Sequence, residues 1–464
     1  MADSKKEVKA GAFYLAGNIV SKAVAFLTIP VFTRLLTTSE YGIVNTYSSW
    51  VQIVSVIMTL SLFNSFRTAV VEKKDDFDAY CASVLRLGGI FSILWTAAAV
   101  IGILVSPVLR EIWWMVICCI IQAYGTFCVT LMSTRYMLLF RYKKRAVFMI
   151  VPNTACAAMA VILLLANRHN RCFWRITAYV AVYAAFILIS LWVMRKEKTD
   201  VRHWGYAVRY SLPLVLHGLS LIILSASDRI MITHMRGPSE SGIYSLAYNL
   251  GLIATAVISS IEGIWLPWFI KKMKDRKTEE INEKAAYLIE NAAAVTIIVM
   301  LTAPELLQVM SPDRYWPGKP VVFPVIAASY IIFLYDIVVN VEYQAKATKE
   351  IAVNTAAAAV FNVALNFIFI PRYGAAAAAY TTAASYIFSM AMHMRSARRY
   401  CSGIFPLGRY VVCHLAVAAF AVLGSLTWDI RFAAVRWPAA AVLSGIYLFM
   451  MFAKKRFVAL QIRV

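Results

Sequence analysis

The sequence is short of charged residues: Asp, Glu, Lys and Arg make up only 15% of its 464 positions, whereas hydrophobic residues make up 61%. Globular proteins in water usually carry about 25% charged residues. A chain of this composition cannot hide its apolar surface in one or two soluble cores. The scarcity of charge therefore excludes an ordinary soluble protein and predicts that lipid is the solvent for most of the chain.

Motifs of metal, nucleotide and nucleophile chemistry are missing as well. The eight cysteines form no Cys-x-x-Cys pair and no Cys/His set at metal-ligand spacing, so we expect neither disulfides nor a metal site. No P-loop, catalytic triad or zinc motif is present. Asp76-Phe77-Asp78 has the look of a metal-nucleotide motif, but it falls in a short connector with no nucleotide-binding fold around it. We therefore expect no enzyme, no ATP use and no cofactor.

Long apolar runs are what the sequence has in abundance. A bilayer core takes roughly 20 apolar residues per helix, and this criterion predicts an all-α polytopic membrane protein with fourteen transmembrane helices. Their predicted bounds are 11–36, 40–66, 79–105, 110–134, 146–166, 173–194, 208–232, 241–269, 285–303, 319–343, 350–370, 374–394, 406–427 and 432–453. The connectors are short and leave no room for a soluble domain.

The basic residues lie mostly in the short loops between the predicted spans. The net charge of +22 would suit nucleic acid, but the loops on the side of the two termini carry about three times as many Lys and Arg residues as the opposite loops. This asymmetry predicts cytoplasmic termini and no nucleic-acid partner. One outer loop, 167–175, breaks the rule with Arg168, Arg171 and Arg175. It is either a topology error or a basic patch that faces an anionic partner.

A pentapeptide recurs along the chain: Ser39–Ile43 (SEYGI) returns as Ser239–Ile243 (SESGI). Each copy stands between two long apolar segments, and six predicted helices separate the copies, so both have the same orientation in the membrane. Helices one to six and seven to twelve are therefore expected to be parallel repeats. The predicted lobes are residues 1–200 and 201–400, and residues 401–464 carry two accessory helices outside the repeat.

Polar side chains inside the first predicted span are candidates for function, because an ionisable group near mid-bilayer costs roughly 2.5–3.5 kcal/mol. Asn18 and Lys22 share one face of this helix. Lys22 lies near the midpoint of the helix, a position that argues against snorkelling to the interface. It is either a cation that faces a cavity or one partner of a packing salt bridge.

The seventh predicted span carries three ionisable residues. His217 and Asp228 lie only about 20° apart around the helix, and Arg229 follows Asp228 directly. The Asp-Arg pair either braces helices or contacts a substrate. A lone histidine such as His217 is more often a hydrogen-bonded residue between helices.

Carboxylates also occur in the eighth and tenth spans, at Glu262 and Asp336, and Asn340 shares a polar face with Asp336. These carboxylates are candidates for coupling to a proton or cation, or else for bracing helices. Arg34 and Arg67 close the first two spans, where arginines usually anchor helix ends at the interface.

Three segments give the sequence a resemblance to a known family. Residues 26–42 (FLTIPVFTRLLTTSEYG) resemble the first-helix signature of Wzx-type polysaccharide (O-antigen) flippases. Residues 227–248, which begin Ser-Asp-Arg-Ile-Met-Ile, resemble the seventh- and eighth-helix signature, and residues 371–376 (PRYGAA) are similar to a third recurring segment. The order and spacing of these segments resemble the oligosaccharide flippase family of the multidrug/oligosaccharidyl-lipid/polysaccharide (MOP) exporter superfamily.

This resemblance implies a V-shaped bundle with a central cationic cavity in the bacterial cytoplasmic (inner) membrane. It implies alternating-access transport of an undecaprenyl-diphosphate-linked oligosaccharide for cell-surface polysaccharide assembly. The expected partners are that glycan, membrane lipid, a polysaccharide polymerase and chain-length proteins, and the expected energy source is a proton or sodium gradient. For the diphosphate and sugar cavity we predict Lys22, Asn18, Arg34, Arg67 and Arg229. For ion coupling or helix bracing we predict Asp228, Asp336, Glu262, Asn340 and His217.

Two alternatives remain open. A multidrug or cation antiporter of the same fold would be expected to bind cations with carboxylates, whereas the charge in the first span is Lys22. A lipid II flippase shares the two accessory helices, which in that branch shape a groove for the lipid tail. The second span, however, lacks a mid-helix arginine before Arg67.

Overall fold

The computed structural model describes residues 2–453, and all regular elements among them are helices. Eight of these described helices are long and apolar enough to cross a membrane, or nine if the bent pair α2–α3 is one span. Each of the fourteen predicted spans falls on a helix, with two of them on the long helix α13. The predicted all-α polytopic membrane fold is thereby confirmed.

The chain divides into two compact units between Ile222 and Ile223, a point inside helix α9. The helices of the first unit are α1 (Ala2–Leu35), α2 (Thr38–Thr59), α3 (Phe66–Glu72), α4 (Phe77–Val105), α5 (Pro107–Glu111), α6 (Trp113–Leu138), α7 (Tyr142–Ala166), α8 (Arg171–Val193) and the first part of α9 (Arg202–Arg236). The predicted lobes 1–200 and 201–400 stay a prediction.

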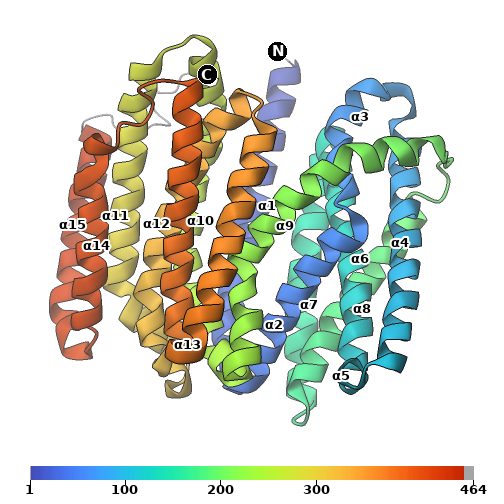
Figure 1. Ribbon diagram of the computed structural model, residues 1–464, viewed down its shortest axis with the longest axis horizontal. Helices are drawn as coiled ribbons and strands as arrows, with labels where there is room; N and C mark the ends of the chain where they lie inside the picture. Colours follow the sequence, from blue (N-terminus) through green and yellow to red (C-terminus); the bar gives the residue numbers. More distant parts are fainter. Residues whose placement is uncertain (1, 454–464) are drawn as a thin grey trace. The chain divides into compact units, whose positions relative to one another are not determined.

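The second unit contains the rest of α9 and the longest helices of the chain. Its further helices are α10 (Pro238–Lys274), α11 (Thr278–Met310), α12 (Lys319–Gln344), α13 (Thr348–Tyr400), α14 (Val411–Leu426) and α15 (Ala433–Ala453). Within this unit, α14 and α15 both pack against α11 (Figure 1). The two accessory helices predicted at 406–427 and 432–453 are therefore present.

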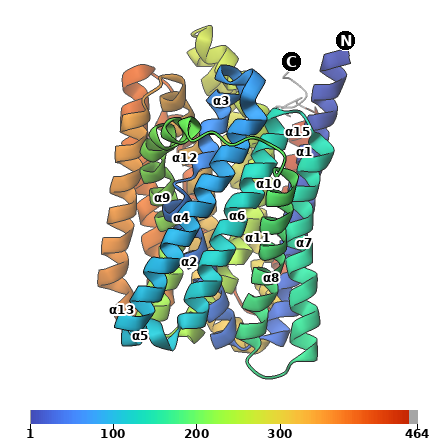
Figure 2. The same cartoon turned by 90° about the vertical axis from the view of Figure 1, so that its right-hand side faces the viewer.

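The core of the first unit lies around α6, which packs against α2, α4, α7 and α8 (Figure 2). Its fully buried side chains include the aromatic rings of Phe66, Tyr80 and Phe127. The Tyr80 hydroxyl donates to Ser65 Oγ at 2.7 Å, so the polar tip of a buried ring has a partner. Apolar burial of this kind is expected to contribute about 1.5–3 kcal/mol per large side chain.

The second predicted span is bent rather than straight. We predicted one helix over 40–66, but α2 ends at Thr59 and the chain turns by 56° into the segment that contains α3. Leu60 and Ser61 adopt left-handed conformations with φ of 49° and 46°. Because neither residue is glycine, each costs roughly 1–2 kcal/mol in backbone energy, which the surrounding packing has to offset.

Helix α13 is two helices joined at a kink. Gly374, with φ 65° and ψ −152°, interrupts the helical geometry between the two halves. This conformation is accessible in practice only to glycine. The kink separates the predicted eleventh and twelfth spans, 350–370 and 374–394.

The glutamates of the repeated pentapeptide cap helices. Glu40 accepts a hydrogen bond from Thr37 N at 2.9 Å, and Thr37 Oγ1 accepts one from Glu40 N, which together form a capping box at the start of α2. Glu240 instead reaches across to α13, where its Oε1 accepts from Ala375 N at 2.6 Å, directly after the kink. Glu240 also pairs with Arg236 at 3.1 Å. The repeat is therefore structural.

The apolar faces of the helices differ in what covers them. In the most apolar part of α12, 72% of the residues are buried, but in α4 only 6% are. Ile93, Leu104 and Val105 on α4 are 70%, 66% and 77% exposed. So large an apolar surface needs lipid against it. The chain is a multi-pass membrane protein.

Candidate functional site

The buried carboxylate of Asp228, on α9, is the centre of a polar cluster in the second unit. The side chain is almost fully enclosed, with Asp228 only 1% exposed. Its Oδ2 accepts hydrogen bonds from Tyr244 Oη and from Thr382 Oγ1, both at 2.6 Å, and its Oδ1 accepts from Asn366 Nδ2 at 2.7 Å. These donors come from α10 and from both halves of α13, so one carboxylate ties together four helical segments.

A second layer of oxygen atoms surrounds this carboxylate. Asn366 Nδ2 also donates to Asn362 Oδ1 at 3.1 Å, and Ser227 Oγ donates to the same oxygen at 3.3 Å. Thr381 Oγ1 donates to Asn366 Oδ1. Carboxylate, amide and hydroxyl oxygens are the ligands that hard cations prefer. The arrangement can therefore brace the helices, and it has the donor types that a proton or a sodium ion would use.

Arg229 lies directly beside the cluster, next to Asp228 on α9. Its guanidinium carbon is 4.5 Å from the centroid of the Tyr248 ring, a cation–π contact. The backbone oxygen of Arg229 accepts from Ser241 Oγ at 3.1 Å. Of the predicted Asp228-Arg229 neighbours, Asp228 thus accepts from hydrogen-bond donors and Arg229 contacts an aromatic ring.

A second buried cluster, centred on Glu342 of α12, was not predicted. Both Glu342 and His393 of α13 have fully buried side chains, and His393 Nδ1 and Glu342 Oε2 form a hydrogen-bonded pair. Asn354 Nδ2 donates to Glu342 Oε1 at 3.3 Å and to Ser396 Oγ at 3.0 Å. Glu342 lies one position inside the end of the predicted tenth span, where hydropathy gives no reason to expect full burial.

The predicted cavity cations in the first unit have different surroundings. Lys22 of α1 has an exposed side chain, and its neighbour Ser21 donates to Met149 O of α7 at 3.0 Å. Arg34 donates to Pro30 O of its own helix at 3.0 Å. Arg67 is exposed on α3, beyond the bend. All three side chains are exposed, and their place in a substrate cavity stays a prediction.

The remaining predicted site residues are spread over both units. His217 on α9 and Asp336 on α12 are half-buried, whereas Asn340 on α12 is buried. Asn340 Nδ2 has no hydrogen-bond partner within the part of the chain that the structure describes. The side chains of Asn18 and Glu262 lie outside the described residues. A role for any of these residues stays a prediction.

An open groove of about 360 Å³ runs between α11, α14 and α15. Its wall is largely apolar, formed by side chains such as Ile297, Leu443 and Ile446, and Glu290 and Tyr287 stand in the same lining. The groove is therefore mostly apolar, with a few polar side chains on α11.

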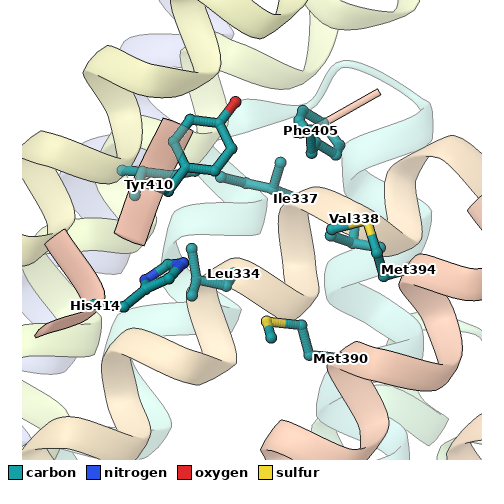
Figure 3. A pocket seen from close by; sticks show the side chains of 9 residues that line it. Leu334, Ile337, Val338, Met390, Met394, Phe405, Tyr410 and His414 are labelled. Carbon is teal, nitrogen blue, oxygen red and sulfur yellow. The ribbon is translucent and has the colours of Figure 1, made fainter. Parts of the chain in front are cut away.

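A smaller cavity lies between α11, α12, α13 and α14 (Figure 3). Its volume is about 20 Å³, which is roughly the space that one water molecule needs. His414 lines it, and His414 Nδ1 is 2.9 Å from Tyr330 Oη. The cavity is too small to hold a transported solute.

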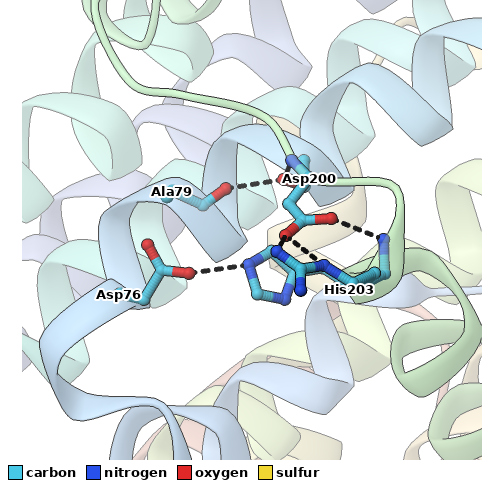
Figure 4. Close-up of polar contacts among 6 residues, drawn as sticks. Asp76, Ala79, Asp200 and His203 are labelled. Carbon is cyan, nitrogen blue, oxygen red and sulfur yellow. Dashed lines mark hydrogen bonds and ion pairs between the residues drawn. The ribbon is translucent and has the colours of Figure 1, made fainter.

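Within the Asp76-Phe77-Asp78 segment, Asp76 pairs with His203 (Figure 4), and Asp78 pairs with a residue of α6. Asp76 Oδ2 is 2.9 Å from His203 Nε2, and Asp78 pairs with Arg135 at 2.6 Å. Both carboxylates therefore have partners from other helices. These contacts fasten the start of α4 to α6 and to the beginning of α9, which supports the view that the resemblance to a nucleotide motif is fortuitous.

Asp200 lies in the connector between α8 and α9. Its carboxylate accepts from Arg202 N and from Arg202 Nε, both at 2.8 Å, and Asp200 N donates to Ser83 Oγ at 2.9 Å (Figure 4). The hydrogen bonds from Arg202 lower the pKa of the Asp200 carboxyl below its usual value. The connector is thus tied to α4 and to the first turn of α9.

The basic loop 167–175 contacts its own unit. The Arg175 guanidinium lies 3.7 Å from the Phe32 ring centroid and 4.1 Å from that of Tyr179. Arg171 donates to the backbone oxygen of Leu35. Two of the three arginines therefore hold α8 against the end of α1. An anionic partner of this loop stays a prediction.

The fold has close counterparts among solved membrane transporters. The lipid II flippase MurJ in an inward closed conformation matches with a TM-score of 0.66 and 13% identity over 96% of this chain and 99% of that protein. A multidrug resistance MATE family transporter of the MOP superfamily, in an inward-facing conformation, matches with a TM-score of 0.57 and 12% identity over 83% of this chain and 98% of that one. The chain has the fold of MOP-superfamily transporters.

The family follows from the sequence comparison. Residues 8–273 match the family described as polysaccharide biosynthesis protein. This is more than half of the chain, and the protein belongs to that family. The resemblance seen in the sequence is confirmed.

Two relatives are similar at low identity. A protein of the Lsg locus of Haemophilus influenzae is 23% identical over 295 residues, which cover 59% of this chain and 68% of that protein. The succinoglycan biosynthesis transport protein ExoT of Rhizobium meliloti is 23% identical over 265 residues, which cover 54% of this chain and 51% of that protein.

Proposed function

We propose that the protein is a flippase that moves an undecaprenyl-diphosphate-linked oligosaccharide across the bacterial cytoplasmic membrane by alternating access. The oligosaccharide would then enter the assembly of cell-surface polysaccharide, and no covalent bond would be made or broken. The proposal includes cytoplasmic termini, a polysaccharide polymerase and chain-length proteins as partners, and a non-enzymatic role.

The groove between α11, α14 and α15 is the observation that carries this proposal. A polyprenyl chain is apolar and long, whereas its diphosphate end is strongly charged. The groove has a volume of about 360 Å³, and its wall is largely apolar. The tail can therefore remain in a lipid-like environment while the head group moves. Membership of the polysaccharide biosynthesis family supports a glycan as the cargo.

A multidrug or cation antiporter of the same fold is the second candidate, and the MATE transporter is the observation that favours it. Lys22 distinguishes the two, because a cation inside the transport path attracts a diphosphate and repels a cationic drug. A lipid II flippase is the third candidate, supported by the MurJ-like fold.

Deletion of the gene followed by lipid extraction separates these candidates. A flippase for a polysaccharide precursor predicts that a diphosphate-linked oligosaccharide accumulates on the cytoplasmic leaflet. Accumulated lipid II would favour the third candidate. Unchanged glycans together with altered drug tolerance would refute the proposal in favour of the antiporter.

The role of Lys22 is tested with a pair of variants. Lys22→Gln removes the charge and keeps a polar side chain that is one bond shorter, whereas Lys22→Arg keeps the charge. We expect the glutamine variant to lose complementation at an unchanged protein level, and the arginine variant to retain most of it, because a diphosphate needs a cation in low dielectric. Full activity of Lys22→Gln would remove Lys22 from the mechanism.

We further propose that the Asp228 cluster couples transport to a proton or sodium gradient. The support is the cluster of hydroxyl and amide groups around a carboxylate that is 1% exposed. Asp228→Asn should make transport in proteoliposomes insensitive to the imposed gradient. The same measurement on Asp336→Asn tests Asp336, the other predicted coupling carboxylate whose side chain the structure describes. A folded Asp228→Asn protein that still responds to both gradients would leave Asp228 with bracing alone.

A further inference from the structure

A pocket of about 460 Å³ lies in the first unit where α6 ends, α7 begins and α8 ends. It is separate from the Asp228 cluster and from the α11–α14–α15 groove. Its floor is aromatic, because Tyr136 and Phe148 are only 2% and 6% exposed and their ring centroids are 5.6 Å apart. On the open side Val147 and Trp192 are 49% and 64% exposed.

The rim of this pocket is basic. Lys144, Arg195 and Lys196 belong to the lining, and none of the eight lining residues is acidic. No ion pair with a carboxylate joins these three side chains in the described part of the chain. By contrast, Lys272 is paired with Glu280 at 2.7 Å. Within the described residues, no carboxylate therefore neutralises the positive charge of the rim.

Aromatic rings hold two of the rim cations in place. The Arg195 guanidinium carbon is 4.2 Å from the Trp192 ring centroid, and Lys144 Nζ is 5.9 Å from that of Tyr136. A guanidinium that stacks on a ring keeps its edge donors available for a phosphate oxygen. The rim thus presents oriented donors and not only diffuse charge.

We propose that this pocket binds the phosphate head group of an anionic membrane lipid, with the acyl chains along Val147 and Trp192. The chemistry that it recognises is a phosphate ester next to an apolar chain. Trp and Tyr are typical of the membrane–water interface, and juxtamembrane Lys and Arg side chains attract anionic lipids. The pocket stands at the ends of three spans, the depth at which a head group lies. Free phosphate shares the charged part of this chemistry but lacks the apolar part.

Two charge-matched triple variants of the full-length protein test the proposal. The pocket variant carries Lys144→Gln, Arg195→Gln and Lys196→Gln. The control variant carries Lys271→Gln, Lys274→Gln and Arg395→Gln, which remove the same charge from exposed helical positions in the second unit. Because all six side chains are exposed, both variants are expected to fold, and size-exclusion chromatography and the melting temperature check this.

Binding is measured by native mass spectrometry of delipidated protein titrated with phosphatidylglycerol or phosphatidylcholine. Each basic residue near an anionic lipid contributes roughly five-fold in affinity. We therefore expect the pocket variant to bind phosphatidylglycerol about 100-fold more weakly than the unmodified protein. The control variant should stay within about two-fold, and phosphatidylcholine should not distinguish the three proteins.

Inorganic phosphate at millimolar concentration is the competing arm. If phosphate displaces phosphatidylglycerol only weakly, the acyl chains contribute and the lipid is the ligand. Phosphate binding without phosphatidylglycerol binding would assign the pocket to a free anion and overturn the proposal. Equal losses in both triple variants, or no loss in the pocket variant, would overturn it too. None of these results depends on which substrate the protein transports.

Discussion

Replacing Gly374 by alanine should destabilise the second unit, because two independent penalties meet at this residue. Its backbone has φ 65° and ψ −152°, and a residue with a side chain costs about 1–3 kcal/mol there. A Cβ atom would stand 2.1 Å from Glu240 Oε1, so the carboxylate would have to move. That movement breaks the 2.6 Å hydrogen bond from Ala375 N.

The expected loss can be estimated from these contacts. A hydrogen bond to a charged acceptor contributes about 1.5–3 kcal/mol, and the lower half of this range applies because the Glu240 side chain is 29% exposed. Together with the backbone term, Gly374→Ala should cost about 2.5–5 kcal/mol. We expect the melting temperature in lipid nanodiscs to fall by on the order of 5–10 °C, measured by intrinsic fluorescence.

Two further variants separate the causes. Gly218→Ala in α9 is the control, because no atom lies within 4 Å of the added Cβ and alanine is the better helix former. Gly374→Ala combined with Glu240→Ala removes the collision but keeps the backbone strain, so its loss should be smaller than the sum of the two single losses. If the Gly374→Ala protein has the same melting temperature as the Gly218→Ala protein, this reasoning is refuted.

The other predictions concern buried and exposed carboxylates. Glu342→Leu should cost about 2–5 kcal/mol in unfolding free energy, because His393 and Asn354 lose their buried acceptor; Glu342→Gln, which keeps an acceptor, should recover part of this in the same melting assay. Asp200 has a lowered pKa because of Arg202, so its stabilisation is present above the ordinary pKa of about 3.9 and is lost as the pH falls through the lower folded value. The difference in melting temperature between the unmodified protein and Asp200→Asn should therefore become smaller below about pH 4. A difference that grows in acid would contradict the stabilising role of the ionised Asp200 carboxyl.

Hydropathy located the spans because bilayer thickness fixes how many apolar residues a crossing helix needs. It did not predict the bend after Thr59, since the left-handed positions are occupied by Leu60 and Ser61 and no proline or glycine marks them. At Gly374 a glycine does stand at the kink, and there the sequence separated the two spans. Bends set by packing are invisible to a composition window, whereas bends set by a special residue are not.

The candidate site could be predicted only in part. Asp228 was identifiable because a carboxylate inside an apolar span is costly. Its partners Asn366 and Thr382 lie 138 and 154 positions further on, a separation that no local pattern bridges. Glu342 and His393 are 51 positions apart and were missed for the same reason. Such pairs become visible only when helix packing is known.

The hydrogen bonds of Asp228 also have consequences for biogenesis. During synthesis α9 reaches the membrane well before residues 366 and 382 have been translated, and only Tyr244, 16 positions later, follows soon. Until α13 is inserted, the carboxylate has to rely on Tyr244, water or a proton for its remaining interactions. Insertion of α9 is therefore expected to be reversible at first. It should become stable once α13 has been inserted and its side chains reach Asp228.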